Sequence, residues 1–280
     1  MEDGREHESV ALLAGVRKSY QMDAVTVPVL QGIDVAVRPA FFTVLLGPSG
    51  SGKTTLLNLL GCLDRPDEGK VMVAGTDVTS LTNDELADFR SENIGFVFQS
   101  FNLIPVLTAF ENVEYPLILA GMDPERRQRR VKRLLEAVGL DQRAHNRPGQ
   151  MSGGQRQRVA IARALARKPK LVIADEPTAN LDSQTGAAII ALMRWMQQNF
   201  KISFIFSSHD SGLIKAADDL IVLRDGVIQS VRRKPDPGSA PAEPHMIAAS
   251  PDLAPDPAWG AEAPDTDFAY LSEETRPFEP

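Results

Sequence analysis

A glycine-rich octapeptide between an apolar run and a short helical pattern constrains this chain more than any other feature. Residues Gly47 to Thr54 read Gly-Pro-Ser-Gly-Ser-Gly-Lys-Thr and fit the pattern G-x-x-x-x-G-K-[ST] at every defined position. The run Phe41 to Leu46 before it indicates a buried strand, and Thr54 to Leu60 after it indicates a helix that Gly61 ends. A strand, a loop of this kind and a helix predict a site for the phosphates of a nucleotide.

The chemistry of this loop follows from its backbone. Glycines allow successive N–H groups to face one anion, and the positive end of the helix dipole adds to their attraction. Lys53 is expected to reach the β and γ phosphates, and Thr54 to offer its hydroxyl to Mg²⁺. A glycine-rich turn without a ligand is the alternative, which the flanking strand and helix disfavour. The predicted cradle comprises Gly47, Pro48, Ser49, Gly50, Ser51, Gly52, Lys53, Thr54 and Thr55.

Two adjacent carboxylates follow a second apolar run. Leu171 to Ala174 is typical of a buried parallel strand, and Asp175 and Glu176 come directly after it. Because the carboxyl ends of parallel strands border the ligand crevice, both side chains are expected near the phosphates. We expect Asp175 to hold the Mg²⁺ hydration shell and Glu176 to orient or deprotonate an attacking water. Taken alone, the pair could equally be solvated acids at an ordinary strand end.

A third motif, Met151-Ser152-Gly153-Gly154-Gln155, stands directly before a basic segment that predicts a helix from Arg156 to Lys168, ended by Pro169. Here the sequence resembles the ATP-binding subunits of ABC transporters, whose signature loop is usually written Leu-Ser-Gly-Gly-Gln. The serine and the two glycine amides form an anion nest without a lysine, which is half a site. The resemblance implies that Ser152, Gly153, Gly154 and Gln155 close over the ATP held by a second copy, so that two chains enclose two ATP molecules.

The same resemblance implies roles for four further residues. Gln99, after the run Ile94 to Phe98, corresponds to the glutamine that touches Mg²⁺ and the attacking water, and His209 to the histidine that contacts the γ-phosphate. Asp182 corresponds to the aspartate that crosses the dimer interface, and Tyr20 to the aromatic residue that stacks on adenine. Plainer interpretations stay open: a surface or core tyrosine, a solvated histidine, and an aspartate that caps a helix.

A narrower resemblance comes from the segments Phe89-Arg90, Ile94 to Leu103 and Leu107 to Val113. They are similar to the ATPases of the macrolide-exporter and lipoprotein-release group, whose membrane partners carry large extracytoplasmic domains. The resemblance covers about residues 9 to 231. Two departures, Met151 for the usual leucine and Ser208 where threonine is common, conserve size or chemistry.

The composition is that of a protein without a membrane span. The chain has 280 residues, 43% of them apolar, which is enough for one α/β domain with a smaller lobe. No run approaches the roughly 18 apolar residues of a spanning helix, and Met1 to Ser9 lacks a signal core. The single cysteine, Cys62, excludes an internal disulfide and suits a reducing cytoplasm, either as a packed hydrophobe or as a reactive thiol. With the resemblance, this predicts a cytoplasmic protein that lies peripherally on the cytoplasmic face of the inner cell membrane.

The charge is concentrated at the C-terminus. Residues 234–280 contain ten Asp or Glu residues against Lys234 and Arg276, and ten of the twenty prolines, whereas the net charge of the whole chain is −7. Such a segment cannot bury enough apolar surface to fold alone, and we predict a disordered acidic tail. Its aromatic residues Trp259, Phe268 and Tyr270 are either docking anchors or parts of an inert tail. The predicted organisation is a flexible segment over residues 1–8, an ATP-binding domain over 9–233 and this tail.

The predicted fold class is α/β: a P-loop NTPase core with a parallel sheet, an antiparallel β subdomain and an α-helical subdomain. The parallel strands end at Leu46, Phe98, Ala174 and Phe206. Alternation in Ile33 to Val37 indicates the antiparallel sheet, which would carry Tyr20. Asp225-Gly226 between two apolar runs indicates a hairpin.

The helical subdomain is expected over about residues 100–165. Thr108 and Glu111 form a capping box, and Asp123-Pro124 begins a helix that Gly139 ends. Its apolar stripe is followed on the opposite side by five arginines, which form either a solvated face or a cationic surface for lipid or an acidic segment. The resemblance places the contact with the permease at Phe101 to Val106. The arginines are Arg126, Arg127, Arg129, Arg130 and Arg133.

The predicted partners are a second copy of the chain and an integral membrane permease, with ATP and Mg²⁺ as cofactors. A soluble ABC ATPase acting on DNA or ribosomes is disfavoured, because the sequence has one phosphate loop, one signature and no sustained heptads. Residues 1–233 carry a charge near zero, which argues against nucleic acid. An ordinary kinase would leave Ser152 to Gln155 and His209 unexplained. A cell-division-type ATPase that regulates a membrane partner without transport uses the same residues and stays open.

Overall fold

The computed structural model describes residues 9–23 and 25–235. Two predictions, the flexible segment 1–8 and the tail 234–280, therefore lie outside the described residues except for Lys234 and Pro235. Lys234 continues the last strand, because its backbone N–H donates to the Asp218 carbonyl at 2.8 Å.

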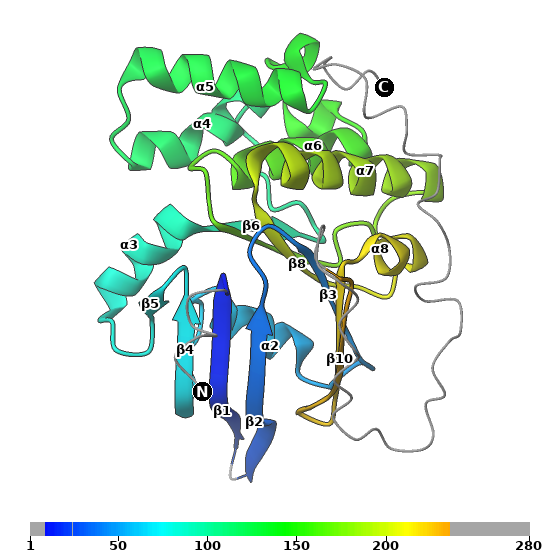
Figure 1. Ribbon diagram of the computed structural model, residues 1–280. Helices are drawn as coiled ribbons and strands as arrows, with labels where there is room; N and C mark the ends of the chain where they lie inside the picture. The colour runs from blue at the N-terminus through cyan, green and yellow to red at the C-terminus, as the bar shows by residue number, and fades with distance from the viewer. Residues whose placement is uncertain (1–8, 24, 236–280) are drawn as a thin grey trace.

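Two sheets and a helical layer make up the described chain (Figure 1). The strands are β1 (Ala11–Met22), β2 (Val25–Val37), β3 (Phe42–Leu46), β4 (Glu68–Val73), β5 (Thr76–Asp77), β6 (Ile94–Phe98), β7 (Leu171–Asp175), β8 (Ser203–Ser207), β9 (Asp219–Arg224) and β10 (Val227–Arg233). The helices are α2 (Lys53–Leu60), α3 (Asn83–Asn93), α4 (Ala109–Leu119), α5 (Pro124–Ala137), α6 (Gly153–Ala164), α7 (Ser183–Phe200) and α8 (Ser211–Ala216), with 3-10 turns η1 (Asp141–Arg143) and η2 (Pro148–Gln150).

The larger sheet has the strand order β10-β9-β3-β8-β7-β6 and is parallel except for β10. The β9–β10 turn holds Asp225 and Gly226 at φ 49° and 74°, so the predicted hairpin is confirmed. The smaller sheet, β2-β1-β4-β5, is antiparallel, as the alternation in Ile33 to Val37 predicted.

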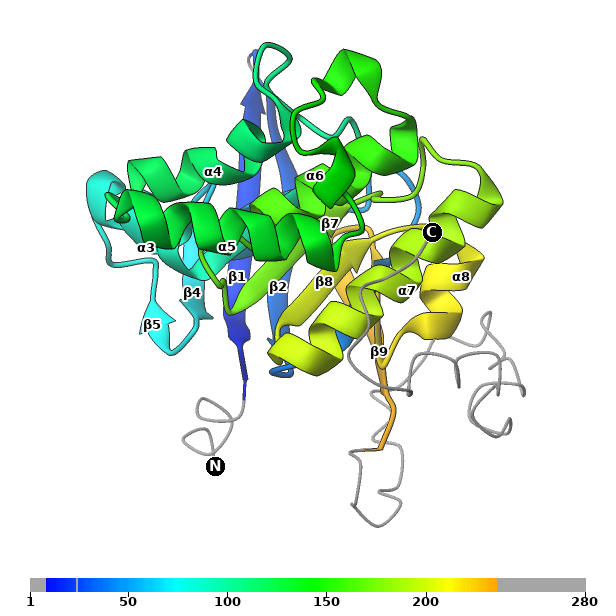
Figure 2. The same ribbon diagram turned by 90° about the horizontal axis from the view of Figure 1, so that it is seen from above.

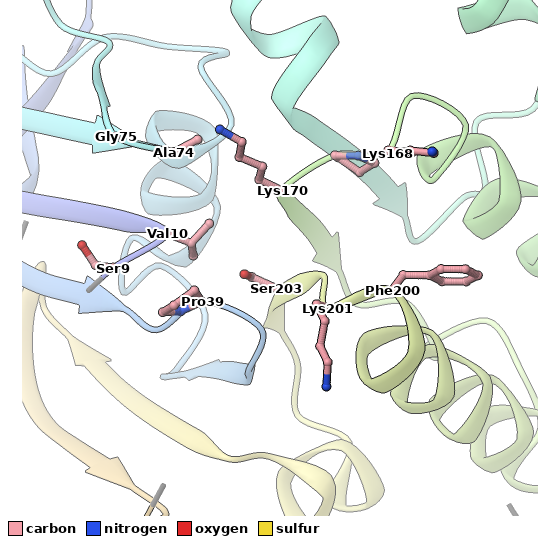
Figure 3. Close-up of a pocket in the computed structure, with 11 residues that line it drawn as sticks. Ser9, Val10, Pro39, Ala74, Gly75, Lys168, Lys170, Phe200, Lys201 and Ser203 are labelled. Atoms are coloured by element: carbon pink, nitrogen blue, oxygen red, sulfur yellow. The ribbon is translucent and has the colours of Figure 1, made fainter. Parts of the chain in front are cut away.

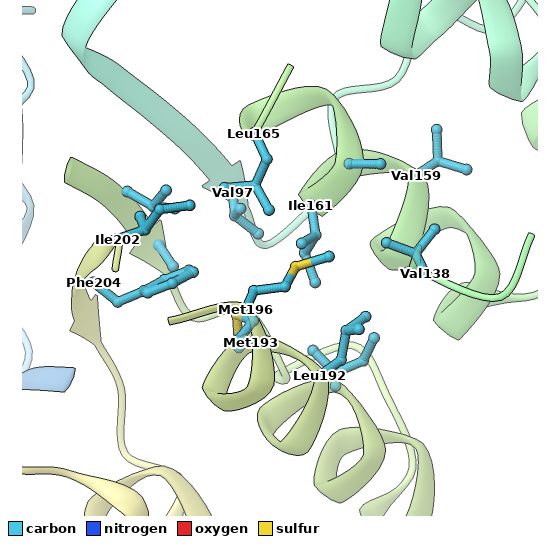
Figure 4. Close-up of a cluster of buried hydrophobic side chains, with 14 of the residues drawn as sticks. Val97, Val138, Val159, Ile161, Leu165, Leu192, Met193, Met196, Ile202 and Phe204 are labelled. Atoms are coloured by element: carbon cyan, nitrogen blue, oxygen red, sulfur yellow. The ribbon is translucent and has the colours of Figure 1, made fainter. Parts of the chain in front are cut away.

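The larger sheet separates two apolar cores. On one face, Phe42, Phe204 and Phe206 are fully buried and pack ring to ring. This core extends to Met193 and Met196 of α7 and to α6 (Figure 4). On the other face, Leu45, Ile173 and Ile205 join α2 and the antiparallel sheet. Because side chains alternate along each strand, both faces are apolar and the strands read as continuous hydrophobic runs.

The helices α4, α5 and α6 lie together above the sheet, with α4 and α5 side by side (Figures 1 and 2). The capping box of Thr108 and Glu111 begins α4, and Asp123 caps α5, as predicted. The arginine face of α5 is only partly solvated. Arg127 bonds Glu114 at 2.7 Å, and Arg130 donates to the carbonyls of Leu165 and Ala166.

The helix after the Ser-Gly-Gly-Gln motif differs from its prediction at both ends. It spans Gly153–Ala164 rather than Arg156 to Lys168, so the two glycines belong to its first turn. It begins early because Ser152 caps it. It ends at Ala164, and the carbonyls of the next two residues, Leu165 and Ala166, accept hydrogen bonds from Arg130 of α5, a contact that no local pattern contains. Among the described helices, none has both the length and the apolar character that crossing a membrane requires.

Candidate nucleotide site

Four neighbouring strands deliver the predicted catalytic residues to one edge of the larger sheet. In the order β3-β8-β7-β6, each strand is followed by a predicted site segment, because parallel strands end on the same side. The ladder pairs Leu45 with Ser207, Ser207 with Asp175, and Asp175 with Phe98. The phosphate loop, His209, Glu176 and Gln99 therefore all lie at this edge, just after the carboxyl ends of their strands.

The phosphate loop leads into α2 without a side-chain cap. Its helix begins after Gly52, which has φ +101°, and a Cβ there would lie 2.8 Å from Leu30 Cδ2 and 3.0 Å from the Val29 carbonyl. Only glycine fits this position. The Lys53 ammonium donates to the carbonyls of Gly47 and Pro48 at 2.6 and 2.9 Å, so the cation lies within the loop itself.

The residues of the loop fit a triphosphate. The first N–H groups of α2 have no side-chain acceptor, and the buried Ser51 hydroxyl has no hydrogen-bond partner within the described residues. Unused donors beside a lysine and a positive helix end are the features that hold phosphate oxygens. Thr55 is buried in the first turn and Thr54 is exposed.

Two of the three residues predicted for Mg²⁺ lie together, whereas Gln99 is not among the residues that line their pocket. Thr54 and Asp175 line one small pocket at the end of β7, with Asn58 of α2 beside them. A hydroxyl and a carboxylate are hard oxygen ligands, and Mg²⁺ commonly takes one or two of these from protein and the rest from phosphate and water. The donor set therefore suits Mg²⁺ bound with a nucleotide. Asn58 was absent from the prediction, although it lies four residues after Thr54 on the same helix face.

Glu176 and His209 come together although they are 33 positions apart. Glu176 Oε1 lies 3.9 Å from His209 Nε2, and Glu176 Oε2 accepts from the Ser208 hydroxyl at 3.3 Å. The Glu176 side chain is 24% exposed and that of His209 60%. Glu176 has φ 45°, which a non-glycine residue rarely adopts, and its N–H donates to the Ser207 carbonyl at 2.9 Å. The strand ladder thus holds the carboxylate in a strained, partly shielded position.

Gln99 is exposed and its segment contacts the one before α7. The Asn180 side-chain amide donates to the Gln99 carbonyl at 2.9 Å. Asp182 caps α7 by accepting from the Thr185 N–H at 2.9 Å, which confirms the capping interpretation of this residue. These hydrogen bonds from Thr185 lower the pKa of Asp182, so it is a carboxylate at neutral pH.

Tyr20 projects from β1 beside the start of α2. Its hydroxyl donates to Asp64 at 2.7 Å, and Lys18 lies 5.2 Å from the centre of its ring. Burial and the bond to Asp64 raise the pKa of the Tyr20 hydroxyl above its usual value of 10.0. The side chain is 37% exposed, which leaves part of the ring free. Tyr20 is therefore a fixed aromatic residue rather than a mobile surface one.

The Ser-Gly-Gly-Gln motif begins α6 and is satisfied within its own helix. Ser152 Oγ accepts from the Gln155 N–H at 3.3 Å, and the Gln155 side chain accepts from the Ser152 N–H at 3.0 Å. A Cβ on Gly154 would lie 2.4 Å from Thr185 Cγ2, so α6 and α7 approach closely there. Across the described residues, no hydrogen bond or ion pair joins this motif to Gly47 to Thr54 of the same chain.

Sequence reasoning missed two arginines of α6 that contact Phe101 and Asn102, shortly after Gln99. Arg163 donates to the carbonyls of Phe101 and Asn102. Phe101 and Asn102 have φ angles of 64° and 46°. Arg156 lies 5.0 Å from the centre of the Phe101 ring. Burial lowers the pKa of Arg163. The spacing of seven between the arginines, which places both on one helix face, was the only signal in the sequence.

The comparisons with known proteins agree with this geometry. The family described as "ABC transporter" matches residues 30–179. An uncharacterized ABC transporter ATP-binding protein of Thermotoga maritima is 47% identical over 227 residues, which cover 81% of this chain and 97% of that protein. The lipoprotein-releasing system ATP-binding protein LolD of Anaeromyxobacter dehalogenans is 48% identical over 77% of this chain and 91% of its own length. The macrolide export ATP-binding/permease protein MacB of Rhodopirellula baltica is 48% identical over 79% of this chain, which spans only 33% of that protein.

A solved structure is similar over most of its length. It is a dimeric post-hydrolysis state of the ATP-binding cassette MJ0796 bound to ADP and Pi, with a TM-score of 0.74 and 40% identity, over 81% of this chain and 99% of that one. Fold, strand-end motifs and relatives lead to the same assignment. The chain belongs to the ABC transporter family, as an ATP-hydrolysing cassette.

Proposed function

We propose that this chain is the ATPase subunit of an export or lipoprotein-release type transporter. Two copies close over two ATP molecules and drive a membrane permease from its cytoplasmic face. The observation that carries this proposal is the division of the motifs. The phosphate loop, Asp175, Glu176 and His209 share one edge of the sheet, whereas within the part of the chain that the structure describes no hydrogen bond or ion pair joins Ser152 to Gln155 to that loop. A second copy would supply the missing half.

The chain's residues have separable tasks in this reaction. ATP bound with Mg²⁺ supplies the phosphoryl group and neutralises its charge. Lys53 and the first N–H groups of α2 hold the phosphates, and Thr54 and Asp175 would hold Mg²⁺ through their side-chain oxygens. Glu176 orients the attacking water and accepts its proton, while the Ser208 hydroxyl donates to its carboxylate at 3.3 Å. His209, 3.9 Å from Glu176, contacts the γ-phosphate.

An exposed apolar surface on α4 suits a membrane partner. Tyr115, Ile118 and Leu119 are 43%, 47% and 71% exposed, and their spacing places them on one helix face. Val106, just before α4, is 71% exposed, whereas Phe101 is buried. Within the predicted permease contact Phe101 to Val106, the exposed residues are Asn102, Pro105 and Val106, and we add the exposed face of α4 to this contact. Relatives named for lipoprotein release and macrolide export support this type of partner.

The test uses Glu176→Gln, which keeps the shape of the side chain and removes the base. Hydrolysis should fall by about 10²- to 10⁴-fold. Tagged Glu176→Gln protein with ATP should retain a multi-span protein with a large extracytoplasmic domain from detergent-solubilised membranes, identified by mass spectrometry. Lys53→Ala in the same membranes should retain much less.

Three results would each contradict a part of the proposal. Recovery of soluble or ribosomal proteins alone would leave a cytoplasmic ATPase. A variant with Ile118→Asp and Leu119→Asp that still hydrolyses ATP and still captures the same membrane protein would remove α4 as the contact. If the captured protein supports no transport when both are reconstituted into vesicles, the cell-division type of ATPase replaces the transporter.

A further inference from the structure

A pocket lies at the opposite edge of the larger sheet from the candidate nucleotide site. The pocket, of about 480 Å³, opens where Pro39 precedes β3, Lys170 precedes β7 and Ser203 begins β8 (Figure 3). Its other wall comes from the antiparallel sheet, at Ser9 and Ala74. The proposed ATPase reaction uses none of these residues.

The rim of this pocket is cationic and partly aromatic. Lys168, Lys170 and Lys201 are exposed, and no ion pair joins them to a carboxylate within residues 9–23 and 25–235. In Figure 3, Lys170 extends toward Ala74 and Lys201 lies on the other side of Ser203, while the Lys168 amine points away from the pocket. Phe200 is 50% exposed. Amines beside an exposed ring suit a ligand that carries both carboxylates and apolar groups.

The chain leaves the described residues at this same edge. The Lys234 N–H donates to the Asp218 carbonyl, the Asp218 N–H donates to the Phe42 carbonyl, and Phe42 pairs with Phe204, next to Ser203. Arg38 donates to the Lys234 carbonyl at 3.0 Å and fixes this end. Since β10 and β8 are three strand spacings apart in the sheet, Lys234 lies about 15 Å from the pocket.

The segment that follows has the complementary chemistry. Residues 236–280 contain ten acidic residues and Arg276 as the only Lys or Arg, together with Trp259, Phe268 and Tyr270. Even a Gly-rich chain as long as the stretch from Pro235 to Trp259 would span about 25–30 Å on average, and Pro-rich chains are more extended, so this length suffices to reach the pocket. Tethering at this distance gives an effective concentration of order millimolar, at which weak contacts suffice.

We propose that the acidic C-terminal segment, residues 236–280, binds in the lysine-rimmed pocket of its own chain. Its carboxylates pair with Lys170 and Lys201, and one of its aromatic side chains contacts Phe200. The bound segment touches both the antiparallel sheet, at Ala74, and the core, at Ser203, and so ties the two sheets together at the edge away from the nucleotide. This proposal does not depend on the permease or on ATP.

Zero-length carbodiimide cross-linking tests the pairing directly, because it joins only amines and carboxylates in contact. The full chain without nucleotide, prepared as an equal mixture of ¹⁴N and ¹⁵N protein, is cross-linked and mapped by mass spectrometry. Lys170 and Lys201 should join carboxylates of residues 236–280 at least about fivefold more often than Lys132, an exposed lysine of α5 on the same tether, because a bound segment stays next to the pocket lysines. Equal yields at Lys132 would overturn the proposal, and isotopically mixed cross-links would assign the pocket to a second copy instead.

Charge reversal provides a second measurement. In a Trp195→Phe background, Trp259 is the only tryptophan, and quenching by neutral acrylamide reports its exposure. Lys170→Glu with Lys201→Glu should raise the quenching constant of Trp259 about twofold or more, because attraction becomes repulsion. The matched control, Arg126→Glu with Arg133→Glu on α5, makes the same charge change at exposed positions and should leave it unchanged. Equal effects of the two pairs, or no effect of the first, would refute the docking.

Discussion

Two helices of this protein begin at glycine-rich turns, and their first turns are used in opposite ways. The start of α2 has no side-chain cap, and Lys53 lies over its loop. The start of α6 carries a complete capping box between Ser152 and Gln155. The first helix start therefore has unused N–H donors for a ligand, whereas the second has already used its serine oxygen internally.

The difference explains why one start is a complete anion site and the other only half of one. A triphosphate held at α2 meets a cation, several N–H groups and a helix dipole together. At α6 the capping box leaves the first glycine amides and no lysine, so we expect this surface to bind phosphate only when another chain presents it. Substitutions at the start of α2 should therefore change the affinity for ATP. Substitutions at the start of α6 should mainly change the free energy of unfolding.

The largest expected effect is at α2. Lys53→Ala should weaken ATP binding about 10- to 150-fold, because a charged contact to phosphate contributes roughly 1.5–3 kcal/mol. Isothermal titration calorimetry with ATP measures it, with Lys132→Ala on exposed α5 as the control. Unchanged affinity would show that α2 is no more specialised for anions than α6.

At α6 the close approach to α7 should dominate. Gly154→Ala places a methyl group 2.4 Å from Thr185 Cγ2, and Thr185 is held by its 2.7 Å bond to Asp182. The free energy of unfolding should fall by about 1–3 kcal/mol, measured by urea unfolding. Gly149→Ala, with open space around its Cβ, should change it by less than about 0.5 kcal/mol. A stabilised Gly154→Ala protein, as helix propensity alone implies, would contradict this packing.

Substitutions of Ser152 should have a smaller effect on stability, and they distinguish its role as a helix cap from a role in the contact between two copies. Ser152→Ala should cost about 1 kcal/mol of stability, because the Gln155 N–H loses its acceptor, while Ser152→Asn should cost only a few tenths. ATP-induced dimerisation of each variant in a Glu176→Gln background can be followed by analytical ultracentrifugation. If Ser152→Asn is stable but fails to dimerise, the serine acts across the interface; if both dimerise normally, its role is capping alone.

The smallest effect is expected just beyond the other end of α2. Cys62 is 1% exposed, and burial raises the pKa of its thiol from 9.0 to about 11. Iodoacetamide at pH 8 should leave the folded protein unlabelled and its ATP binding intact, while the urea-unfolded chain reacts. The protonated thiol favours the folded state, so its contribution is complete below pH 9 and is lost as the pH rises through about 11. Rapid labelling of the native protein would instead make Cys62 reactive.

Local patterns predicted the elements well where propensity and tertiary contacts agree. Thr108 with Glu111, and Asp225 with Gly226, produced the predicted cap and hairpin, because each depends on residues a few positions apart. The helix after Ser152 was misplaced at both ends: Ser152 caps it before the two glycines, and it ends at Ala164, where Arg130 of another helix donates to the carbonyls of the two residues that follow. Nothing in the sequence distinguishes the arginines of α5 from one another. In the structure, however, Arg127 bonds Glu114 and Arg130 bonds the Ala166 carbonyl, contacts that helical periodicity does not predict.

The sequence by itself determined which chemical groups are present: a phosphate loop, two carboxylates after a strand, a serine-glycine helix start and an acidic end. Only the tertiary structure decided their neighbours. The strand order β3-β8-β7-β6 brings Glu176 to His209 and Gln99 to Asn180, and it places Lys170 beside Ser203 on the opposite edge. The physical reason is that motifs depend on spacing along the chain, whereas these contacts depend on which strands share backbone hydrogen bonds, and that is fixed by packing of the whole core.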